Sequence, residues 1–284
     1  MNVFVRSAAE IMQIRSIVTV ADQLALLAPG LVVARGSTAV LAHAPALARV
    51  PNDLDVFWLG PDTAVPELIT ALSDDPRLRV FTTKDVATQD RRVSLLHRID
   101  VLVWLSDDPP PSHRFWVDIS TSRQTEPTET IPVAATSFFT VPTKVVVLSD
   151  VLAEKLFVYV ESTQRMRTVM RWSDLFDMLV LILAAPALTQ LPLGDVQLAV
   201  QRHFSRRAIE PPRTLPPPPR IWRSAWYRLV GPIAQIAPDI NRASIAAAAF
   251  WNPVLREGGA PVDASWDVKG WRWVSGDMSS ERSR

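Results

Sequence analysis

Two aspartates, Asp53 and Asp55, lie two positions apart inside an apolar stretch that is typical of a β-strand. Because side chains alternate between the faces of a strand, both carboxylates are expected on the same face. Their mutual repulsion favours a cation between them, and hard oxygen ligands suit Mg²⁺ or Mn²⁺ bound to a triphosphate. Asp118 stands in another strand-like run, residues 115–120. It is a candidate third metal ligand from a neighbouring strand, with an aspartate facing solvent at a strand end as the alternative.

A candidate phosphate seat precedes the acid pair. The segment Arg35-Gly36-Ser37-Thr38 stands between a predicted strand and a predicted helix. Glycine lets a ligand approach the backbone closely, and the free amides of a helix N-terminus favour an anion. The hydroxyls of Ser37 and Thr38 add two donors. An ordinary helix start has the same composition, so the segment alone does not decide the matter.

A third group of charged residues, in the second half of the chain, comprises Lys155, Arg171, Asp174 and Asp177. The two aspartates are three positions apart on a predicted helix and share a face, with Arg171 beside Asp174. Apolar neighbours surround them, and a partly buried acid needs a partner, for which Arg171 or Lys155 is the natural choice. A structural ion pair between two helices explains the same pattern.

The elements that position these residues follow from hydrophobic periodicity. In the first half we expect helices at 7–27, 36–48 and 66–73, and strands at 31–34, 53–59, 77–83, 97–105, 115–120 and 145–148. In the second half we expect helices over 149–185 with a break near 164–168, over 193–206, and over 221–255 with interruptions at Pro232 and Pro238. We also expect a proline-rich connector at 210–220 and a tail that packs through Trp266, Trp271 and Trp273.

This layout predicts an α+β protein with two domains. Residues 1–148 form a mixed sheet with helices, and residues 149–284 form a helical domain that carries Lys155 and Asp174 and completes a cleft. The chain has 284 residues, a net charge of +1 and no cysteine. Disulfides, cysteine-ligated metals and a thiol nucleophile are therefore excluded. The four histidines lack ligand spacing.

The sequence contains neither a signal-peptide pattern at its start nor an apolar run that would span a membrane. The most apolar stretch, residues 178–188, is too short and contains Pro186. We therefore expect a cytoplasmic protein without membrane contact. Because the net charge is small, any contact with nucleic acid must come from a local basic patch. The candidates for RNA backbone contacts and base stacking are Arg202, Arg206, Arg207, Arg213, Arg220 and Trp222.

The order of these motifs resembles the polymerase-beta-like nucleotidyltransferase superfamily, and in particular its AbiEii/AbiGii toxin branch, which includes the mycobacterial Men-type toxins. The resemblance rests on Gly36-Ser37, on the Asp53/Asp55 pair with Asp118, and on two later segments. Residues 151–156 are similar to the lysine-containing helix of the branch, and residues 171–177 to its Arg-x-x-Asp-x-x-Asp helix. The motifs span residues 31–183.

Two positions depart from the pattern of the branch. Arg49 keeps the arginine that precedes the acidic pair, but Pro51 replaces a serine, so regulation by phosphorylation at that position is in doubt. Ser37 stands where many relatives have a second glycine, a change that the wider superfamily tolerates.

The resemblance implies a toxin of a toxin–antitoxin or abortive-infection system that acts in phage defence. Such an enzyme transfers a nucleoside monophosphate from an NTP to RNA, above all to the 3′ end of tRNA, so that translation stops and growth is inhibited. A cognate antitoxin would be encoded nearby. Lys155 would bind the triphosphate, Asp174 would be an essential residue of the active site, and Asp53, Asp55 and Asp118 would hold Mg²⁺ or Mn²⁺.

Two other interpretations fit the same residues. The acceptor could be a protein or a small molecule such as an antibiotic, or the chain could bind a nucleotide or an antitoxin without catalysis. Loss of a metal-binding acid would favour the last interpretation, but all the candidate acids are present.

Overall fold

Two units make up the chain in the computed structural model. The sheet unit comprises residues 1–45 and 49–147, and the helical unit comprises residues 46–48 and 148–284. The structure describes residues 6–86, 93–105, 113–122, 126–136, 139–164 and 171–275, so most of the predicted helix break near 164–168 lies outside the description. Within the described ranges no helix is long and apolar enough to cross a bilayer.

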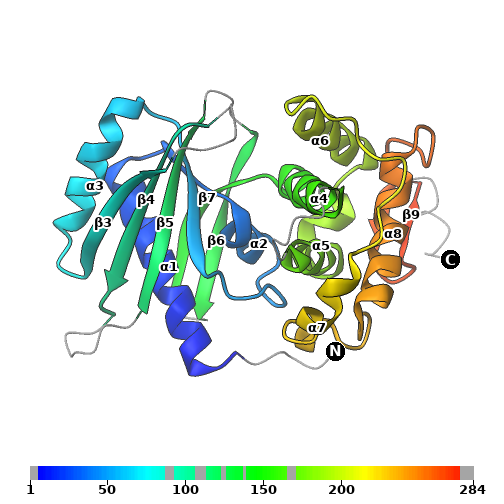
Figure 1. The fold of residues 1–284 in the computed structure, drawn as a ribbon, viewed down its shortest axis with the longest axis horizontal. Coiled ribbons are helices and arrows are strands. Elements are labelled where there is room, and N and C mark those ends of the chain that lie inside the picture. The colour runs from blue at the N-terminus through cyan, green and yellow to red at the C-terminus, as the bar shows by residue number, and fades with distance from the viewer. Residues whose placement is uncertain are drawn as a thin grey trace, which may run out of the picture. The chain divides into compact units, whose positions relative to one another are not determined.

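The sheet unit is built on seven strands in the order β3-β4-β5-β2-β1-β7-β6 (Figure 1). The sheet is mixed, because β2 runs parallel to β5 and β1 parallel to β7, whereas the other neighbouring pairs are antiparallel. The strands are β1 (Val32–Ala34), β2 (Asp53–Trp58), β3 (Leu78–Val86), β4 (Val93–Val103), β5 (His113–Ser122), β6 (Thr128–Thr136) and β7 (Phe139–Val146).

Three α-helices and a 3₁₀ turn flank this sheet: α1 (Ala8–Leu27), α2 (Gly36–His43), η1 (Asp62–Ala64) and α3 (Val65–Ser73). α1 and α3 share one buried core with β2, β4 and β5, to which β2 contributes Leu54, Val56 and Trp58. α2 begins against the side chain of Asp55 on β2, and Figure 1 shows the labelled elements of this unit. Since side chains alternate along β2, the core uses one set of positions and leaves Asp53 and Asp55 on the opposite face.

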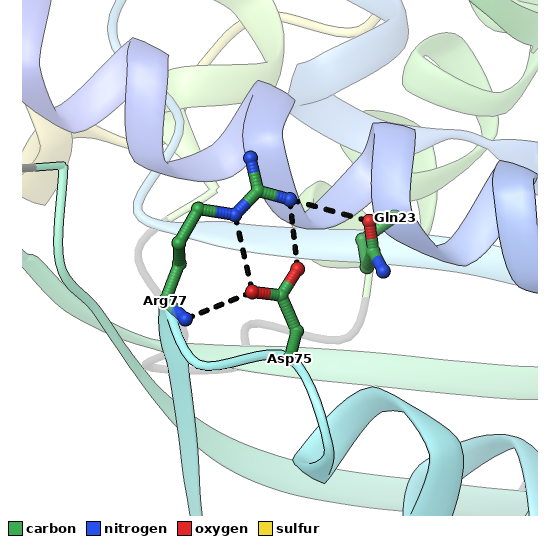
Figure 2. A network of polar contacts seen from close by, with 3 residues as sticks. All are labelled: Gln23, Asp75 and Arg77. Atoms are coloured by element: carbon green, nitrogen blue, oxygen red, sulfur yellow. Dashed lines mark hydrogen bonds and ion pairs between the residues drawn. The ribbon is translucent and has the colours of Figure 1, made fainter.

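Local polar contacts fix α1 and the turn that precedes β3. Ser7 and Glu10 form a capping box at the start of α1, in which each side chain accepts a hydrogen bond from the backbone amide of the other residue. In the turn, Arg77 donates from Nη2 to Asp75 Oδ2 at 2.7 Å and to Gln23 Oε1 of α1 at 3.3 Å (Figure 2). The hydrogen bonds from Arg77 to Asp75 hold the pKa of this carboxyl below its usual value.

The helical unit contains four longer helices, several short turns and one hairpin. Its elements are α4 (Leu148–Gln164), α5 (Trp172–Ala184), η2 (Pro186–Gln190), α6 (Leu193–Ser205), η3 (Arg220–Trp222), α7 (Arg223–Trp226), η4 (Gly231–Ile233), α8 (Ile240–Leu255), β8 (Ser265–Asp267) and β9 (Arg272–Val274). α4 contacts α5 and α6, and α8 contacts α5 and α6.

The proline-rich connector and the tryptophan-rich tail both brace this unit. Pro216 O accepts a hydrogen bond from Tyr159 Oη at 2.7 Å. In the tail, Trp271 Nε1 donates to Ala246 O at 3.0 Å and Trp273 Nε1 donates to Phe250 O at 2.9 Å, both acceptors lying on α8. The packing role predicted for these tryptophans is confirmed.

Two expectations about the sheet unit were wrong in detail. The helix that starts at Gly36 ends at His43 rather than near residue 48, because Pro45 follows and disfavours a helical conformation of the residue before it. The strand expected at 145–148 is the end of β7, and Leu148 already belongs to α4.

Three further strands, β6, β8 and β9, were missed. β6 is an edge strand that contains Pro132, and the edge of a sheet tolerates a proline that would argue against a central strand. The hairpin β8–β9 means that the second unit is not wholly helical. Each strand of this hairpin has only three residues, too few for hydrophobic alternation to reveal it.

Candidate functional site

Strand pairing brings the three predicted metal-binding acids together on one face of the sheet. Asp53 and Asp55 are half-buried at the start of β2. The parallel register of β2 and β5 places Asp118 directly opposite Asp55. Paired residues of neighbouring strands point to the same side, so all three carboxylates lie on the face opposite the α1–α3 core.

Arg98 on β4 extends this line by one strand. It lies opposite Asp118 in the antiparallel register of β4 and β5. Its Nε donates to Asp118 Oδ1 at 2.7 Å and its Nη2 donates to Asp118 Oδ2 at 2.6 Å, which is a bidentate pair. Hydrogen bonding to Asp118, together with the charges of Asp118, Asp53 and Asp55, raises the pKa of Arg98.

The Arg98 guanidinium is hydrogen-bonded to both carboxylate oxygens of Asp118, one of the three proposed metal ligands. Within the described part of the chain, no group of three or more His, Cys, Asp or Glu side chains is arranged to hold a metal ion. The donor set nevertheless has the chemistry of a site for a hard divalent cation, because three carboxylates share a face and already attract a cationic group of the chain itself. A cation bound to all three acids would compete with Arg98 for Asp118.

The glycine of the predicted phosphate seat touches the acid pair. Gly36 has φ +58°, and a Cβ built on it would lie 2.3 Å from Asp55 Oδ2. The backbone amide of Arg35 donates to Asp55 O at 2.9 Å. The start of α2 and the acidic strand are therefore in direct contact, and this approach requires glycine for both its φ angle and its lack of a side chain.

The other predicted residues of this segment have different environments. Ser37 and Thr38 are both buried, and Thr38 Oγ1 has no hydrogen-bond partner among the described residues. The Arg35 guanidinium lies over the Phe57 ring, 4.2 Å from its centre. Arg49 is half-buried in the loop before β2. Of these side chains, Thr38 alone leaves a buried polar atom unpaired, which is uncommon in folded proteins.

The charged residues of the helical unit form a separate cluster. Lys155 on α4 donates from Nζ to Asp174 Oδ1 at 3.1 Å and to Asp177 Oδ2 at 2.7 Å, both on α5. All three side chains are buried. The sequence left open whether Lys155 or Arg171 is the partner of these acids, and the ammonium of Lys155 makes the direct contacts. Arg171 is exposed at the N-cap of α5. Its carbonyl oxygen accepts a hydrogen bond from the Asp174 amide at 3.0 Å, and its side chain acts on Asp174 through its charge.

The two acids of this cluster are not equivalent. Burial raises the pKa of Asp174, and the nearby charge of Lys155 opposes that rise. Asp174 Oδ2 is buried without a hydrogen-bond partner among the described residues. Asp177 has the shorter contact with Lys155 and no exposed side-chain area. The ammonium of Lys155 is thus shared by two buried acids, of which Asp174 has the longer contact.

Several predicted RNA contacts have structural partners inside the helical unit. Arg202 Nη2 donates to the buried Asp150 at 2.7 Å, and the Arg207 guanidinium lies 3.9 Å from the centre of the Phe157 ring. Trp222 is fully buried, so its predicted role in base stacking is wrong. Arg206 is half-buried, whereas Arg213 and Arg220 are exposed.

Arg98 was missed in the sequence. It lies in a predicted strand and is separated from Asp118 by nineteen intervening positions. Alternation along β4 shows which residues share a face with Arg98. It does not show that Arg98 lies opposite Asp118, because that requires the pairing register of β4 with β5.

Comparisons with known proteins identify the family of the chain and solved structures with a similar fold. A family described as "Nucleotidyl transferase AbiEii toxin, Type IV TA system" matches residues 24–252. The fold is similar to the crystal structure of JHP933 from Helicobacter pylori, with a TM-score of 0.51, 14% identity, and coverage of 88% of this chain and 95% of that chain. The fold is also similar to the crystal structure of a protein from H. pylori that is provisionally assigned as a nucleotidyltransferase. The TM-score is 0.50 and the sequence identity 14%, with coverage of 88% of this chain and 97% of that chain. No curated protein sequence matches the chain.

Proposed function

Since this chain belongs to the AbiEii family of nucleotidyltransferase toxins, we propose that it transfers a nucleoside monophosphate from an NTP to RNA, with the 3′ end of tRNA as the acceptor. The family match makes the chain a nucleotidyltransferase of a toxin–antitoxin system, for which an NTP substrate, a divalent metal and an antitoxin partner are general features. The choice of RNA, the use of Mg²⁺ and the arrest of translation are the parts that we add.

The observation that carries the proposal is the acidic face of β2 and β5. Asp53, Asp55 and Asp118 lie side by side there, and Gly36 places the start of α2 against Asp55. These three acids would hold Mg²⁺ or Mn²⁺. A bound ion of this kind neutralises triphosphate charge and lowers the pKa of an attacking hydroxyl.

The remaining residues act on the nucleotide itself. The positive end of the α2 dipole and the backbone amides from Gly36 onward suit phosphate oxygens. Thr38 Oγ1, which has no hydrogen-bond partner within the described ranges, would gain one from the phosphate. We assign Lys155 to the triphosphate and Asp174 and Asp177 to its positioning, because both carboxylates hold its ammonium. Arg35, Arg49 and Arg171 are secondary candidates for anion contacts.

The reaction conserves atoms in one displacement. The terminal hydroxyl oxygen of the RNA forms a bond to the α-phosphorus of the NTP, the bond from that phosphorus to the bridging oxygen of pyrophosphate breaks, and the hydroxyl proton leaves to solvent or to a carboxylate. A tRNA capped in this way does not accept an amino acid at its original terminus. Translation therefore stops, and growth is inhibited unless the antitoxin intervenes.

The direct test is incorporation of each of the four labelled NTPs into total tRNA in the presence of Mg²⁺. We expect label on RNA from the wild type and none from Asp53→Asn, which keeps the shape of the side chain but removes one charge of the acidic face. Asp74→Asn is the matched control, because Asp74 is exposed at the end of α3, a helix that packs on the opposite face.

Each other outcome has a definite meaning. Label on a protein or on a small molecule such as an antibiotic in place of RNA would refute the proposed acceptor but retain the enzyme class. Absence of any transfer from folded wild type, with NTP binding intact, would favour a binding protein. Equal labelling by wild type and Asp53→Asn would refute the assignment of the acidic face.

A further inference from the structure

The most informative contact that the proposed reaction does not use is the pair of Arg98 with Asp118. Its geometry is bidentate, with donor–acceptor distances of 2.7 and 2.6 Å. The Asp118 side chain is 10% exposed and that of Arg98 is 41% exposed. The acid is thus fixed in the sheet, whereas much of the guanidinium faces solvent.

The same guanidinium serves more than one acid. Asp53 and Asp55 both act on Arg98 through their charge, in addition to Asp118. The positive charge of Arg98 thus acts on three carboxylates at once. Three acids on one face of the sheet are also the kind of oxygen donor set that a divalent cation prefers.

We propose that Arg98 is the built-in counter-cation of the acidic face formed by Asp53, Asp55 and Asp118, and that its guanidinium has to leave Asp118 when a divalent cation binds. The proposal rests on the proposed function only in assigning a metal to Asp53, Asp55 and Asp118. Both oxygens of Asp118 are engaged by Arg98, so an incoming cation competes directly with the guanidinium for this ligand.

A second contact gives Arg98 a place to remain after release. The Arg98 guanidinium lies 5.8 Å from the centre of the Trp116 ring, which is partly exposed on β5. A guanidinium over an aromatic face has a favourable interaction without any carboxylate. The side chain therefore needs only to shift along the strand surface, and the sheet itself does not have to change.

The neighbouring pair on the same two strands offers a matched control. Arg114 on β5 donates from Nε to Asp100 Oδ1 of β4 at 2.9 Å and also contacts Asp100 through Nη2. This pair joins β4 to β5, as Arg98 and Asp118 do, but involves none of the three acids assigned to the metal. A general loss of strand bracing would affect both pairs, whereas competition with a metal concerns Arg98 alone.

The experiment measures Mn²⁺ binding to the full chain without nucleotide or RNA, from the electron paramagnetic resonance signal of free Mn²⁺. We expect Arg98→Met to lower the Kd by roughly fivefold, the factor that an ion pair of this exposure supports. Arg114→Met should leave the Kd unchanged. The double variant Asp53→Asn/Arg98→Met should not show this increase in Mn²⁺ affinity. That result would assign the bound Mn²⁺ to the acidic face.

Stability provides the second measurement. Without metal, Arg98→Met should lower the urea midpoint, because the acids lose their counter-cation, and saturating Mn²⁺ should restore it. The urea midpoint of Arg114→Met should remain below that of the wild type when both proteins are saturated with Mn²⁺. A Kd for Arg98→Met that equals or exceeds the wild-type value, including absence of binding in both proteins, overturns the proposal and makes Arg98 a structural brace. The binding assay contains no acceptor, so a wrong choice of RNA leaves its result intact.

Discussion

Replacing Gly36 by alanine is the most direct test of the contact between the start of α2 and the acidic strand. Two penalties are expected. A side chain at φ +58° costs about 1 kcal/mol for the left-handed conformation. In addition, the new Cβ would lie 2.3 Å from Asp55 Oδ2, well inside the shortest contact that real Cβ atoms make. The carboxylate therefore has to move by most of an ångström.

The second penalty should appear mainly in function. Misplacement of a reacting group by about 1 Å lowers a rate by roughly 100-fold. We therefore expect Gly36→Ala to retain its fold, to bind Mn²⁺ more weakly and to lose about two orders of magnitude in NTP incorporation.

Gly30 supplies the control for backbone strain alone. Its φ is +75°, but a Cβ built on it would meet no atom within 4 Å. Gly30→Ala should therefore lower the free energy of unfolding by about 1 kcal/mol and leave metal binding and incorporation unchanged. The measurements are urea unfolding, Mn²⁺ titration and labelled-NTP incorporation for both variants. The reasoning is refuted if the two variants behave alike in the last two assays.

Two stability measurements test the other charged clusters. Asp75→Asn should lower the free energy of unfolding by about 1 kcal/mol at pH 7, because hydrogen bonds from Arg77 lower the pKa of Asp75 in the folded state. This contribution is fully present above the unfolded pKa of about 3.9. The difference between the variant and the wild type should vanish as the pH falls through the lower pKa of the folded state. Asp177→Asn should cost about 3 kcal/mol in urea unfolding at pH 7, because it removes a charge from the buried pair with Lys155. Asp174→Asn should cost less, since burial already raises the pKa of Asp174 and disfavours its charged form; equal costs would contradict this distinction.

Local signals explain why much of the sheet unit could be predicted. The capping box at Ser7 and Glu10 and the apolar spacing that follows define the start of α1 within one residue. β2 was found with its acid pair because its alternate residues are strongly apolar. β6 was not predicted, because an edge strand requires less apolar alternation than a central strand and tolerates a proline such as Pro132. Helices and strands with a strong local pattern of apolar residues can be predicted from the sequence. Strands that form mainly because a neighbouring strand pairs with them cannot.

The candidate site divides in the same way. Asp53 and Asp55 share a face by strand geometry alone, and this follows from their spacing. Asp118 opposite Asp55 depends on the parallel pairing of β2 and β5, for which the sequence contains no direct signal. Arg98 requires one more register, that of β4 on β5. Each further strand adds an unknown register, and a shift of one residue would move a side chain to the other face.

The two acidic clusters use their cations differently, and exposure explains why. Arg98 is 41% exposed and pairs with one of three carboxylates at the surface of a sheet, so exchanging it for another cation costs little desolvation. Lys155 is 8% exposed and lies between two carboxylates that are almost completely buried, so its removal would leave uncompensated charge inside the helical unit. Loss of Arg98 should therefore change metal affinity more than stability, whereas loss of Lys155 should lower stability whatever it does to activity. A role for Lys155 in catalysis is consequently measurable only in a variant whose folded fraction has been determined first.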